Sequence, residues 1–535
     1  LELLRQPDKW GESFGFAVNG IPFFAKGANW IPADAILTRV EPRDYRRLLE
    51  DAVAAHMNML RVWGGGIYEE DLFYDLCDEL GLCVWQDFMF ACATYPAHRR
   101  EFLENVRAEA ADNVARIRHH ACLALWCGNN ELELGLVSDR WSDWTMSWDD
   151  YRPLFDELLP DVVGELDPGT AYWPASPHTP GPLEVRKNAN DPSRGNAHLW
   201  GVWHGNQPFE WYRSCEHRFN SEFGFQSFPE PRTVASFTEP ADRNISSPVM
   251  EHHQRSGIGN TTIVRYMLEW FRMPTSFEKT LWLSQILQGL AVQYAVEHWR
   301  RCMPRGMGTL YWQLNDCWPV ASWSSIDFEG RWKALHHLAR RFYAPVLVSG
   351  LEDAERGTLE IHLSSDLLKS CSGRLQWAAT RVSGARVAGG SSEVRIAPGR
   401  SRRVQSLDLR PLLKAHGERD LLVWLDFAGD GAPRSSNLVS FVRPKAMELR
   451  DPRIAWSVEP ATGGGCELKL RARRPALWTW IQAEDCDLRL SDNFFHLRPG
   501  RSKKVALCPE RPLSLAQLRR RLRVQSLVDT YADPE

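Results

Sequence analysis

Two glutamates in this chain follow short apolar runs, in a setting suited to acid and base chemistry. Glu131 ends the stretch that begins at Ala124, where apolar residues give way to a glycine, two asparagines and the acid. Glu222 lies in a second such stretch, between Phe219 and Phe225. A carboxylic acid directly after a buried parallel strand is typical of an active site. Two glutamates placed in this way favour acid/base chemistry on a glycosidic bond.

Polar and aromatic residues also end the other apolar runs. A single glutamate after an apolar run is more often a helix start or a surface charge, but the joint placement of these residues favours a common site. In a barrel they would all point into one mouth. The candidate site residues besides the two glutamates are Arg61, Trp63, Asp87, Asn130, Trp203, His204 and Trp312, with Asn315 and Asp316 next to Trp312.

The two glutamates need different environments. One must be protonated to donate to the leaving oxygen, and the other must be ionised to attack the anomeric carbon. Arg61 is the cation expected to keep one carboxylate charged. Carboxyl groups about 5–5.5 Å apart would give retention of configuration, and wider spacing would give inversion. The sequence leaves this separation open.

Strands and helices alternate over the first two thirds of the chain, which predicts a (β/α)8 barrel. A doubly wound open sheet is the alternative, but no strand is followed by a glycine-rich phosphate loop. We interpret the glycine run 64–66 as a tight loop, because it lacks the spacing of a phosphate-binding motif. The eight predicted strands span residues 23–30, 57–63, 82–88, 122–127, 171–176, 198–204, 219–223 and 308–314.

Helices are predicted from apolar stripes. One opens at Glu41-Pro42, with Tyr45, Leu48, Leu49, Ala52 and Val53 on one face. Two more stripes fall between residues 103 and 117 and between 283 and 294. Long loops are predicted at 138–170, 177–197 and 226–262, and loops after barrel strands build the site.

The rest of the chain predicts β-sandwich domains. Short alternating stretches separated by turn residues begin after residue 344, and a break near residue 444 divides them. We predict a barrel over 19–344 and two immunoglobulin-like sandwiches over 345–444 and 445–535. Residues 1–18 are interpreted as the tail of a preceding β-sandwich domain. The chain does not start with Met, so we expect an N-terminal truncation.

Composition excludes several kinds of partner. The net charge of -4 argues against nucleic acid or an anionic membrane as the main partner. No apolar run is long enough to predict a membrane-spanning helix. The 12 cysteines form no CxxC pair and the histidine pairs are sequence neighbours, so neither a disulfide scaffold nor a metal site is predicted. No cofactor is expected. An intracellular or periplasmic location is favoured over a disulfide-rich extracellular one, but the sequence leaves the compartment open. The 24 tryptophans suit a sugar-binding cleft.

Five motifs and a sixth near the C-terminus resemble the β-mannosidases of glycoside hydrolase family 2, and the likeness spans nearly the whole chain. The motifs lie at 29–34, 61–69, 84–91, 126–131, 221–224 and 491–495. The resemblance implies an exo-acting, retaining enzyme that removes terminal non-reducing β-D-mannose from manno-oligosaccharides or glycans. It implies that Glu131 is the acid/base and Glu222 the nucleophile, and that Asn130 hydrogen-bonds the sugar 2-hydroxyl.

The resemblance also implies that Arg61, Trp63, Asp87, Trp203, His204 and Trp312 line the pocket for the terminal sugar. Family members carry β-sandwich domains before the barrel, the first of which helps to close the pocket, so these domains are expected partners of this chain. Another family 2 glycosidase, such as an exo-β-glucosaminidase, is the nearest alternative. The Asn129-Asn130-Glu131 sequence favours the mannosidase. A non-catalytic carbohydrate-binding barrel is the alternative from another class, and the presence of both glutamates argues against it.

Overall fold

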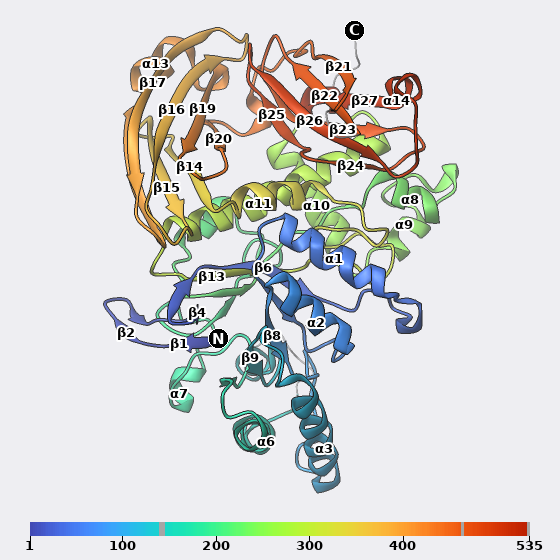
Figure 1. The fold of residues 1–535 in the computed structure, drawn as a ribbon, viewed down its shortest axis with the longest axis vertical. Helices are drawn as coiled ribbons and strands as arrows, with labels where there is room; N and C mark the ends of the chain where they lie inside the picture. The colour runs from blue at the N-terminus through green and yellow to red at the C-terminus, as the bar shows by residue number, and fades with distance from the viewer. Residues whose placement is uncertain (139–144, 462–464, 532–535) are drawn as a thin grey trace. The chain divides into compact units, whose positions relative to one another are not determined.

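Eight parallel strands form one sheet in the order β10-β9-β8-β7-β6-β13-β12-β11 (Figure 1). An isolated bridge between His178 and Asn196 links the segments next to β10 and β11, which are the two ends of this order. The predicted (β/α)8 architecture is therefore confirmed. The strands are β6 (Ala25–Trp30), β7 (Met59–Val62), β8 (Cys83–Asp87), β9 (Leu123–Cys127), β10 (Tyr172–Trp173), β11 (Ala197–His198), β12 (Asn220–Glu222) and β13 (Gly308–Tyr311).

The structure is a computed structural model that describes residues 1–138, 145–461 and 465–531. The chain divides into two compact units, residues 1–225 with 291–331 and residues 226–290 with 332–535. All eight strands of the parallel sheet lie in the first unit. The division passes through the long helix α11 (Phe277–Arg301).

The sixth strand is much shorter than predicted. β11 ends at His198, and the backbone N–H groups of His204 and Gly205 both donate to the carbonyl of Trp200. A side chain at Gly205 would lie 2.5 Å from the carbonyl oxygen of Gly201, so the glycine permits this tight turn. The prediction that Trp203 and His204 end a strand is therefore wrong, because the apolar run turns instead of extending.

Helices follow most of the strands. Helix α1 (Pro42–Ala54) buries Tyr45, Leu48, Leu49 and Ala52 as predicted, whereas Val53 is exposed. The helices α2 (Asp71–Leu80) and α3 (Arg100–Ile117) come next, and a short 3-10 turn, η1 (Leu37–Arg39), precedes α1. Helices α3 and α6 (Leu159–Leu166) lie side by side in Figure 1.

The predicted long loops contain further helices. Within 138–170, residues 139–144 lie outside the described residues, and the remainder holds α5, a π-helical turn and α6. Ser147 caps α5 by accepting from the Asp150 N–H, and prolines open α8 and α9. The polar composition of these segments reflects capping residues as well as loops. The elements are α5 (Trp148–Arg152), η2 (Pro153–Leu158), α7 (Leu183–Arg186), η3 (Phe209–Ser214), α8 (Pro231–Phe237), η4 (Pro240–Asp242), α9 (Pro248–His252) and α10 (Gly259–Trp270).

The N-terminal residues support the sheet from one end. β1 (Glu2–Leu4), β4 (Gly15–Val18) and β5 (Ile21–Phe23) form a small sheet, and β2 (Pro7–Asp8) pairs with β3 (Gly11–Glu12). A turn at Asn19-Gly20 joins β4 to β5, and both residues have a positive φ. Phe14 and Phe16 belong to one buried apolar cluster with Ala25, Met59, Trp85, Ala124, Leu125, Cys127, Trp173, Phe219 and Leu310, which come from most of the strands.

The second unit contains the two predicted β-sandwiches. The first has sheets β14-β15-β18 and β17-β16-β19-β20 around one apolar core, and the second has sheets β21-β22-β26-β24 and β25-β23-β27 around another (Figure 1). Across the described residues, no helix has both the length and the apolar character that crossing a bilayer requires. The strands are β14 (Val346–Asp353), β15 (Thr358–Ser365), β16 (Cys371–Arg381), β17 (Arg386–Ile396), β18 (Arg400–Asp408), β19 (Leu421–Gly429), β20 (Ser435–Ser440), β21 (Ala455–Pro460), β22 (Cys466–Arg471), β23 (Ala476–Ala483), β24 (Leu488–Leu490), β25 (Phe495–Leu497), β26 (Ser502–Pro509) and β27 (Leu522–Gln525).

Short helices accompany the sandwiches: α12 (Ala334–Phe342), α13 (Arg410–His416), η5 (Glu418–Asp420), η6 (Pro444–Ala446), α14 (Leu515–Arg521) and η7 (Leu527–Thr530).

Candidate active site

Glu131 follows β9 in a left-handed backbone conformation, with φ of 63°. It is the N-cap residue of α4 (Leu132–Val137), and its N–H donates to the Ser176 carbonyl at 2.8 Å. Asn129 fixes the same turn, because its Oδ1 accepts from the Leu132 N–H at 3.0 Å. A non-glycine residue in this conformation costs about 1–3 kcal/mol, and such strain is often found at functional sites.

Glu222 is the last residue of β12, and its side chain is only 4% exposed. Arg61 on β7 donates from Nη1 to Glu222 Oε1 at 2.5 Å and to Asn29 Oδ1 at 2.9 Å. Asn29 in turn donates to the carbonyls of Ser221 and Leu310. The nucleophile candidate is therefore held by a cation that is itself fixed to neighbouring strands.

Arg61 is the centre of a buried polar network. Its Nη2 donates to Asp87 Oδ2 at 2.8 Å and to Asn130 Oδ1 at 2.7 Å. Asp87 also accepts from the Trp85 indole and from the Gly64 N–H. The side chains of Arg61 and Asp87 are both 0% exposed. Arg61 therefore holds Glu222 directly and Asp87 holds Arg61, and both are fully buried, which differs from the predicted position in the wall of a sugar pocket.

His198 is a site residue that the sequence reasoning missed. Its Nδ1 lies 2.7 Å from Glu131 Oε1 and 3.3 Å from Glu222 Oε2, so one ring nitrogen faces both carboxylates. The predicted strand extended to residue 204, so the candidate site residues were chosen at that end, as Trp203 and His204. A correct strand boundary at residue 198 would have identified this histidine by the same pattern that identified the glutamates.

The two carboxylates lie close together. One oxygen of each glutamate and one ring nitrogen of His198 lie within 4.8 Å of one another. Two carboxylate oxygens and an imidazole could also ligate a metal ion. Within the described residues these are the only such cluster, and Arg61 already supplies a positive charge to Glu222. The arrangement therefore suits two carboxylates that share one substrate.

Burial and charge set the protonation of this pair. Burial raises the pKa of Glu131, and the charge of Arg61 opposes the rise. Burial also raises the pKa of Glu222, opposed by His198 and Arg61 and reinforced by Glu131. Neighbouring buried carboxylates do not readily ionise together, so the pair holds one proton. Because Glu222 has the direct ion pair with Arg61, the proton belongs on Glu131.

Asn130 and Cys92 lie beside the acid. Arg61 occupies Asn130 Oδ1, and Asn130 Nδ2 lies 3.1 Å from Cys92 Sγ. The Cys92 thiol is also 3.6 Å from Glu131 Oε2, and burial raises the pKa of this thiol. The arginine fixes the orientation of the amide, so Asn130 presents N–H groups rather than its oxygen. No sequence pattern pointed to Cys92.

The predicted aromatic site residues differ in their exposure. The rings of Trp63 and Trp312 meet edge to face with centroids 4.9 Å apart, and both are partly exposed. Trp203 is 0% exposed and packs against Phe225 and Trp323, so it belongs to the apolar core instead of the predicted pocket wall.

His204 and Trp200 come from the turn that follows β11. His204 is exposed, and its charge acts to lower the pKa of Glu131. The neighbouring Trp200, which the sequence reasoning did not select, acts on the same pKa through a hydrogen bond. The turn thus contributes Trp200 and His204 to the acid's surroundings, although it is not a strand.

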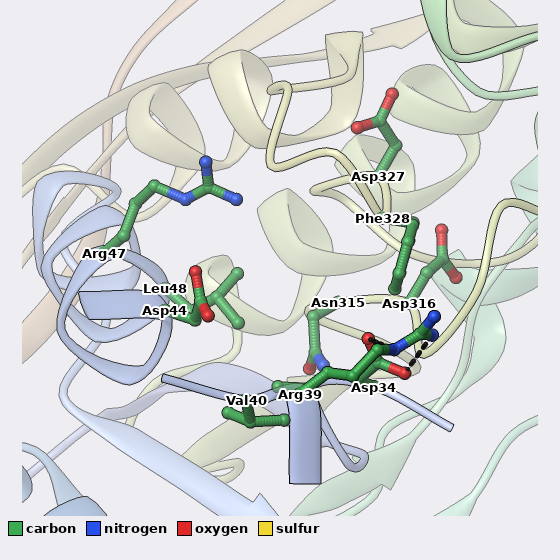
Figure 2. A pocket seen from close by; sticks show the side chains of 11 residues that line it. Asp34, Arg39, Val40, Asp44, Arg47, Leu48, Asn315, Asp316, Asp327 and Phe328 are labelled. Carbon is green, nitrogen blue, oxygen red and sulfur yellow. Dashed lines mark hydrogen bonds and ion pairs between the residues drawn. The ribbon is translucent and has the colours of Figure 1, made fainter. Parts of the chain in front are cut away.

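Asn315 and Asp316 do not join the glutamates. They line a separate cavity of about 120 Å³ with Asp34, Arg39 and Asp327 (Figure 2). Asn315 Nδ2 donates to the carbonyl of Ile31, and Asp316 accepts from two serine hydroxyls. These contacts set them apart from the two glutamates, although they too lie on loops that follow barrel strands, β6 and β13.

The chain is similar to known proteins in its sandwich domains and over most of its length. A Mannosidase Ig/CBM-like domain matches residues 357–446, and an Ig-fold domain of mannosidases matches residues 449–530. The β-mannosidase B of Aspergillus flavus is 33% identical over 538 residues, covering 95% of this chain and 62% of that protein. The β-mannosidase B of Neosartorya fischeri is 40% identical over 361 residues, covering 65% of this chain and 42% of that protein.

A crystal structure of β-D-mannosidase from Dictyoglomus thermophilum superposes with a TM-score of 0.90 at 34% identity, covering 98% of this chain and 63% of that one. Over nearly its whole length this chain is therefore similar to β-mannosidases, and two domain models of mannosidases match its C-terminal part. The exo-chitosanase CsxA of Amycolatopsis orientalis, at 14% identity and a TM-score of 0.75, shares the fold. The chain spans about 62% of the length of the Aspergillus flavus β-mannosidase.

Proposed function

We propose that this chain carries the catalytic centre of a retaining exo-β-mannosidase that removes terminal non-reducing β-D-mannose. The main support is the short distance between the two carboxylates, because one oxygen of Glu131 and one oxygen of Glu222 lie within 4.8 Å of each other. Carboxyl groups about 5–5.5 Å apart serve retaining glycosidases, whereas inverting enzymes need about 6.5–9.5 Å to admit a water between them.

In the first step an oxygen of Glu222 attacks the anomeric carbon, and the bond from that carbon to the glycosidic oxygen breaks. The leaving oxygen takes the proton of Glu131, so a covalent glycosyl ester forms on Glu222 and Glu131 becomes ionised. The ion pair with Arg61 supports this assignment because it keeps Glu222 ionised before attack. Loss of the Glu222 charge raises the tendency of Glu131 to ionise, which favours the proton transfer.

In the second step a water replaces the leaving group. Glu131 takes a proton from this water while the water oxygen attacks the anomeric carbon, and the ester bond to Glu222 breaks. Both carboxyl groups return to their starting states. Two inversions at the same carbon give the sugar its original β configuration.

The preference for mannose rests on the family and on one local contact. Asn130 presents N–H groups toward the site, so it suits a sugar 2-hydroxyl that accepts a hydrogen bond. Trp63 and Trp312 offer an apolar wall on which a pyranose can stack. The relatives named β-mannosidase support the same substrate.

Two measurements test this function. A panel of aryl β-glycosides should give the highest kcat/KM for the mannoside; a higher value for the glucosaminide would make the protein an exo-β-glucosaminidase, and binding without turnover would make it a carbohydrate-binding barrel. Proton NMR of the first product should show β-mannose before mutarotation. Early α-mannose would contradict the retaining mechanism.

A further inference from the structure

We propose that the Ser176 hydroxyl holds His198 in the tautomer that carries its proton on Nδ1, which reserves Glu131 Oε2 for the catalytic proton. This proposal rests on the proposed function and adds a positioning residue to it. Four side chains that the mechanism above does not use come from the segments around β10, β11 and β12: Ser176, Asn196, His198 and Ser221.

The first observation is the environment of Nδ1. It faces Glu131 Oε1 at 2.7 Å and Glu222 Oε2 at 3.3 Å, and the imidazole is 0% exposed. The ionised Glu222 can only accept a hydrogen bond. A lone pair on Nδ1 would be repelled by this oxygen, whereas an N–H on Nδ1 is attracted by both carboxylates. The carboxylates therefore favour the proton on Nδ1.

The second observation is the partner of the other ring nitrogen. His198 Nε2 lies 2.8 Å from Ser176 Oγ, which is fully buried. Asn196 Nδ2 donates to the hydroxyl oxygens of both Ser176 and Ser221 at 2.7 Å. Ser221 Oγ lies 3.0 Å from Ser176 Oγ and can give its own hydrogen to the Ala197 carbonyl at 3.3 Å. The Ser176 hydrogen can then point at Ser221 Oγ or at His198 Nε2, and the carboxylates at Nδ1 favour the second arrangement. In this arrangement every donor in the network has an acceptor.

The ring is neutral in this setting. Burial lowers the pKa of His198 to about 3, and the charge of Arg61 adds to the effect while Glu222 opposes it. A neutral imidazole carries one N–H, so the hydrogen-bond network decides which nitrogen has it. The charged groups that face the ring are Glu131, Glu222 and, through Glu222, Arg61.

The consequence concerns the two oxygens of Glu131. When Nδ1–H donates to Oε1, this oxygen is an acceptor and the carboxyl proton resides on Oε2. Oε2 is the oxygen beside Cys92, a residue with an exposed surface. In the other tautomer, Nδ1 would accept the Glu131 proton on Oε1 and hold it away from a leaving group. The serine therefore acts on catalysis through the histidine.

The first test reads the tautomer directly and needs no turnover. Histidine ring nitrogens labelled with ¹⁵N give different chemical shifts with and without a proton, and the His198 signals are assigned by their loss in His198→Gln. We expect a protonated Nδ1 and an unprotonated Nε2 in the wild-type protein. A protonated Nε2 would overturn the proposal even in an active retaining enzyme.

The second test uses leaving groups. Ser176→Ala should lower kcat/KM for methyl β-mannoside about tenfold more than for 2,4-dinitrophenyl β-mannoside, because only the poor leaving group needs the Glu131 proton. Ser176→Thr, which keeps a hydroxyl, should restore most of the difference. Ser325→Ala removes another buried hydroxyl, whose partner is Tyr311 at 2.7 Å, and should leave the ratio of the two substrates unchanged.

These outcomes separate the proposal from the function on which it rests. An equal loss on both substrates in folded Ser176→Ala would show a merely structural serine. If Ser176→Ala does not fold, Ser176→Thr and the ¹⁵N spectrum of the wild-type protein still decide the tautomer. Release of α-mannose would reject the retaining mechanism while leaving the measured tautomer intact.

Discussion

Arg61 and Glu222 form a buried ion pair, with Nη1 at 2.5 Å from Oε1 and side-chain exposures of 0% and 4%. The same guanidinium binds Asp87, so one cation compensates two buried carboxylates. The pair explains how Glu222 stays ionised beside a protonated Glu131. It also makes the site depend on a residue that has no exposed surface of its own.

Arg61→Lys should therefore damage both stability and activity. A lysine cannot bond all four side chains that accept from the planar guanidinium, and breaking a buried ion pair costs about 3–5 kcal/mol of unfolding free energy. We expect a loss of this size in urea unfolding, and a fall in kcat/KM of at least about 100-fold in the folded fraction. Arg39→Lys is the matched control, because this arginine is 56% exposed and its change should alter stability by less than about 1 kcal/mol. Similar effects of both substitutions would contradict the role of Arg61.

Glu131→Ala should act on leaving groups selectively. Without the acid, hydrolysis of substrates with poor leaving groups should fall by about 10²–10⁴-fold, while the first step on dinitrophenyl mannoside should persist. The variant should also lose the alkaline limb of the pH profile that the proton of Glu131 imposes. Azide, which needs no base, should restore turnover and yield β-mannosyl azide by NMR. Recovery of the α-azide instead would show that Glu222 is not the nucleophile.

Modification of the Cys92 thiol should inactivate the enzyme, because this thiol lies beside Glu131. Its thiol lies 3.6 Å from Glu131 Oε2, and an S-methylthio group there would remove the thiol hydrogen and crowd the acid. Since burial raises the thiol pKa, methyl methanethiosulfonate should inactivate the enzyme faster at alkaline pH. Cys92→Ser should resist inactivation, and Cys508→Ser, which removes the other exposed cysteine, should not. Equal sensitivity of Cys92→Ser and the wild-type protein would place the reactive thiol elsewhere.

Buried histidines should make the fold sensitive to acid. Burial lowers the pKa of His298 to about 3, below the ordinary value of about 6.5. Between these values the unfolded chain binds a proton that the folded chain does not, so stability should fall as pH drops from about 6.5 toward 3. His298→Gln should flatten this dependence in chemical unfolding measured across that range. An unchanged slope would show that His298 does not contribute to it.

The sequence could predict the sheet and most of the glutamate surroundings because they obey one rule. Glu131, Asn130, Asp87 and Glu222 each come at the end of a short apolar run, and parallel strands bring such ends to one edge. The same rule failed for the sixth strand, which ends at His198 because the apolar run after it turns at Gly201 and Gly205. The rule therefore selected Trp203, which is in the core, and omitted His198.

Other parts of the site have no local signature. Ser176 and Asn196 are small polar residues whose importance comes from hydrogen bonds to His198 and to each other across the sheet. Cys92 reaches Glu131 from 39 positions away in the sequence. These contacts depend on the packing of distant segments, which composition and periodicity do not encode.

The most direct measurement traps the covalent intermediate. A 2-deoxy-2-fluoro-β-mannosyl fluoride reacts in the first step and slows the second, so the glycosyl ester should accumulate and activity should be lost with time. Peptide mass spectrometry should find the added fluorosugar on Glu222, with no labelling in Glu222→Ala. A label on Glu131, or continued turnover with unlabelled protein, would contradict the assignment of Glu222 as nucleophile and Glu131 as acid/base.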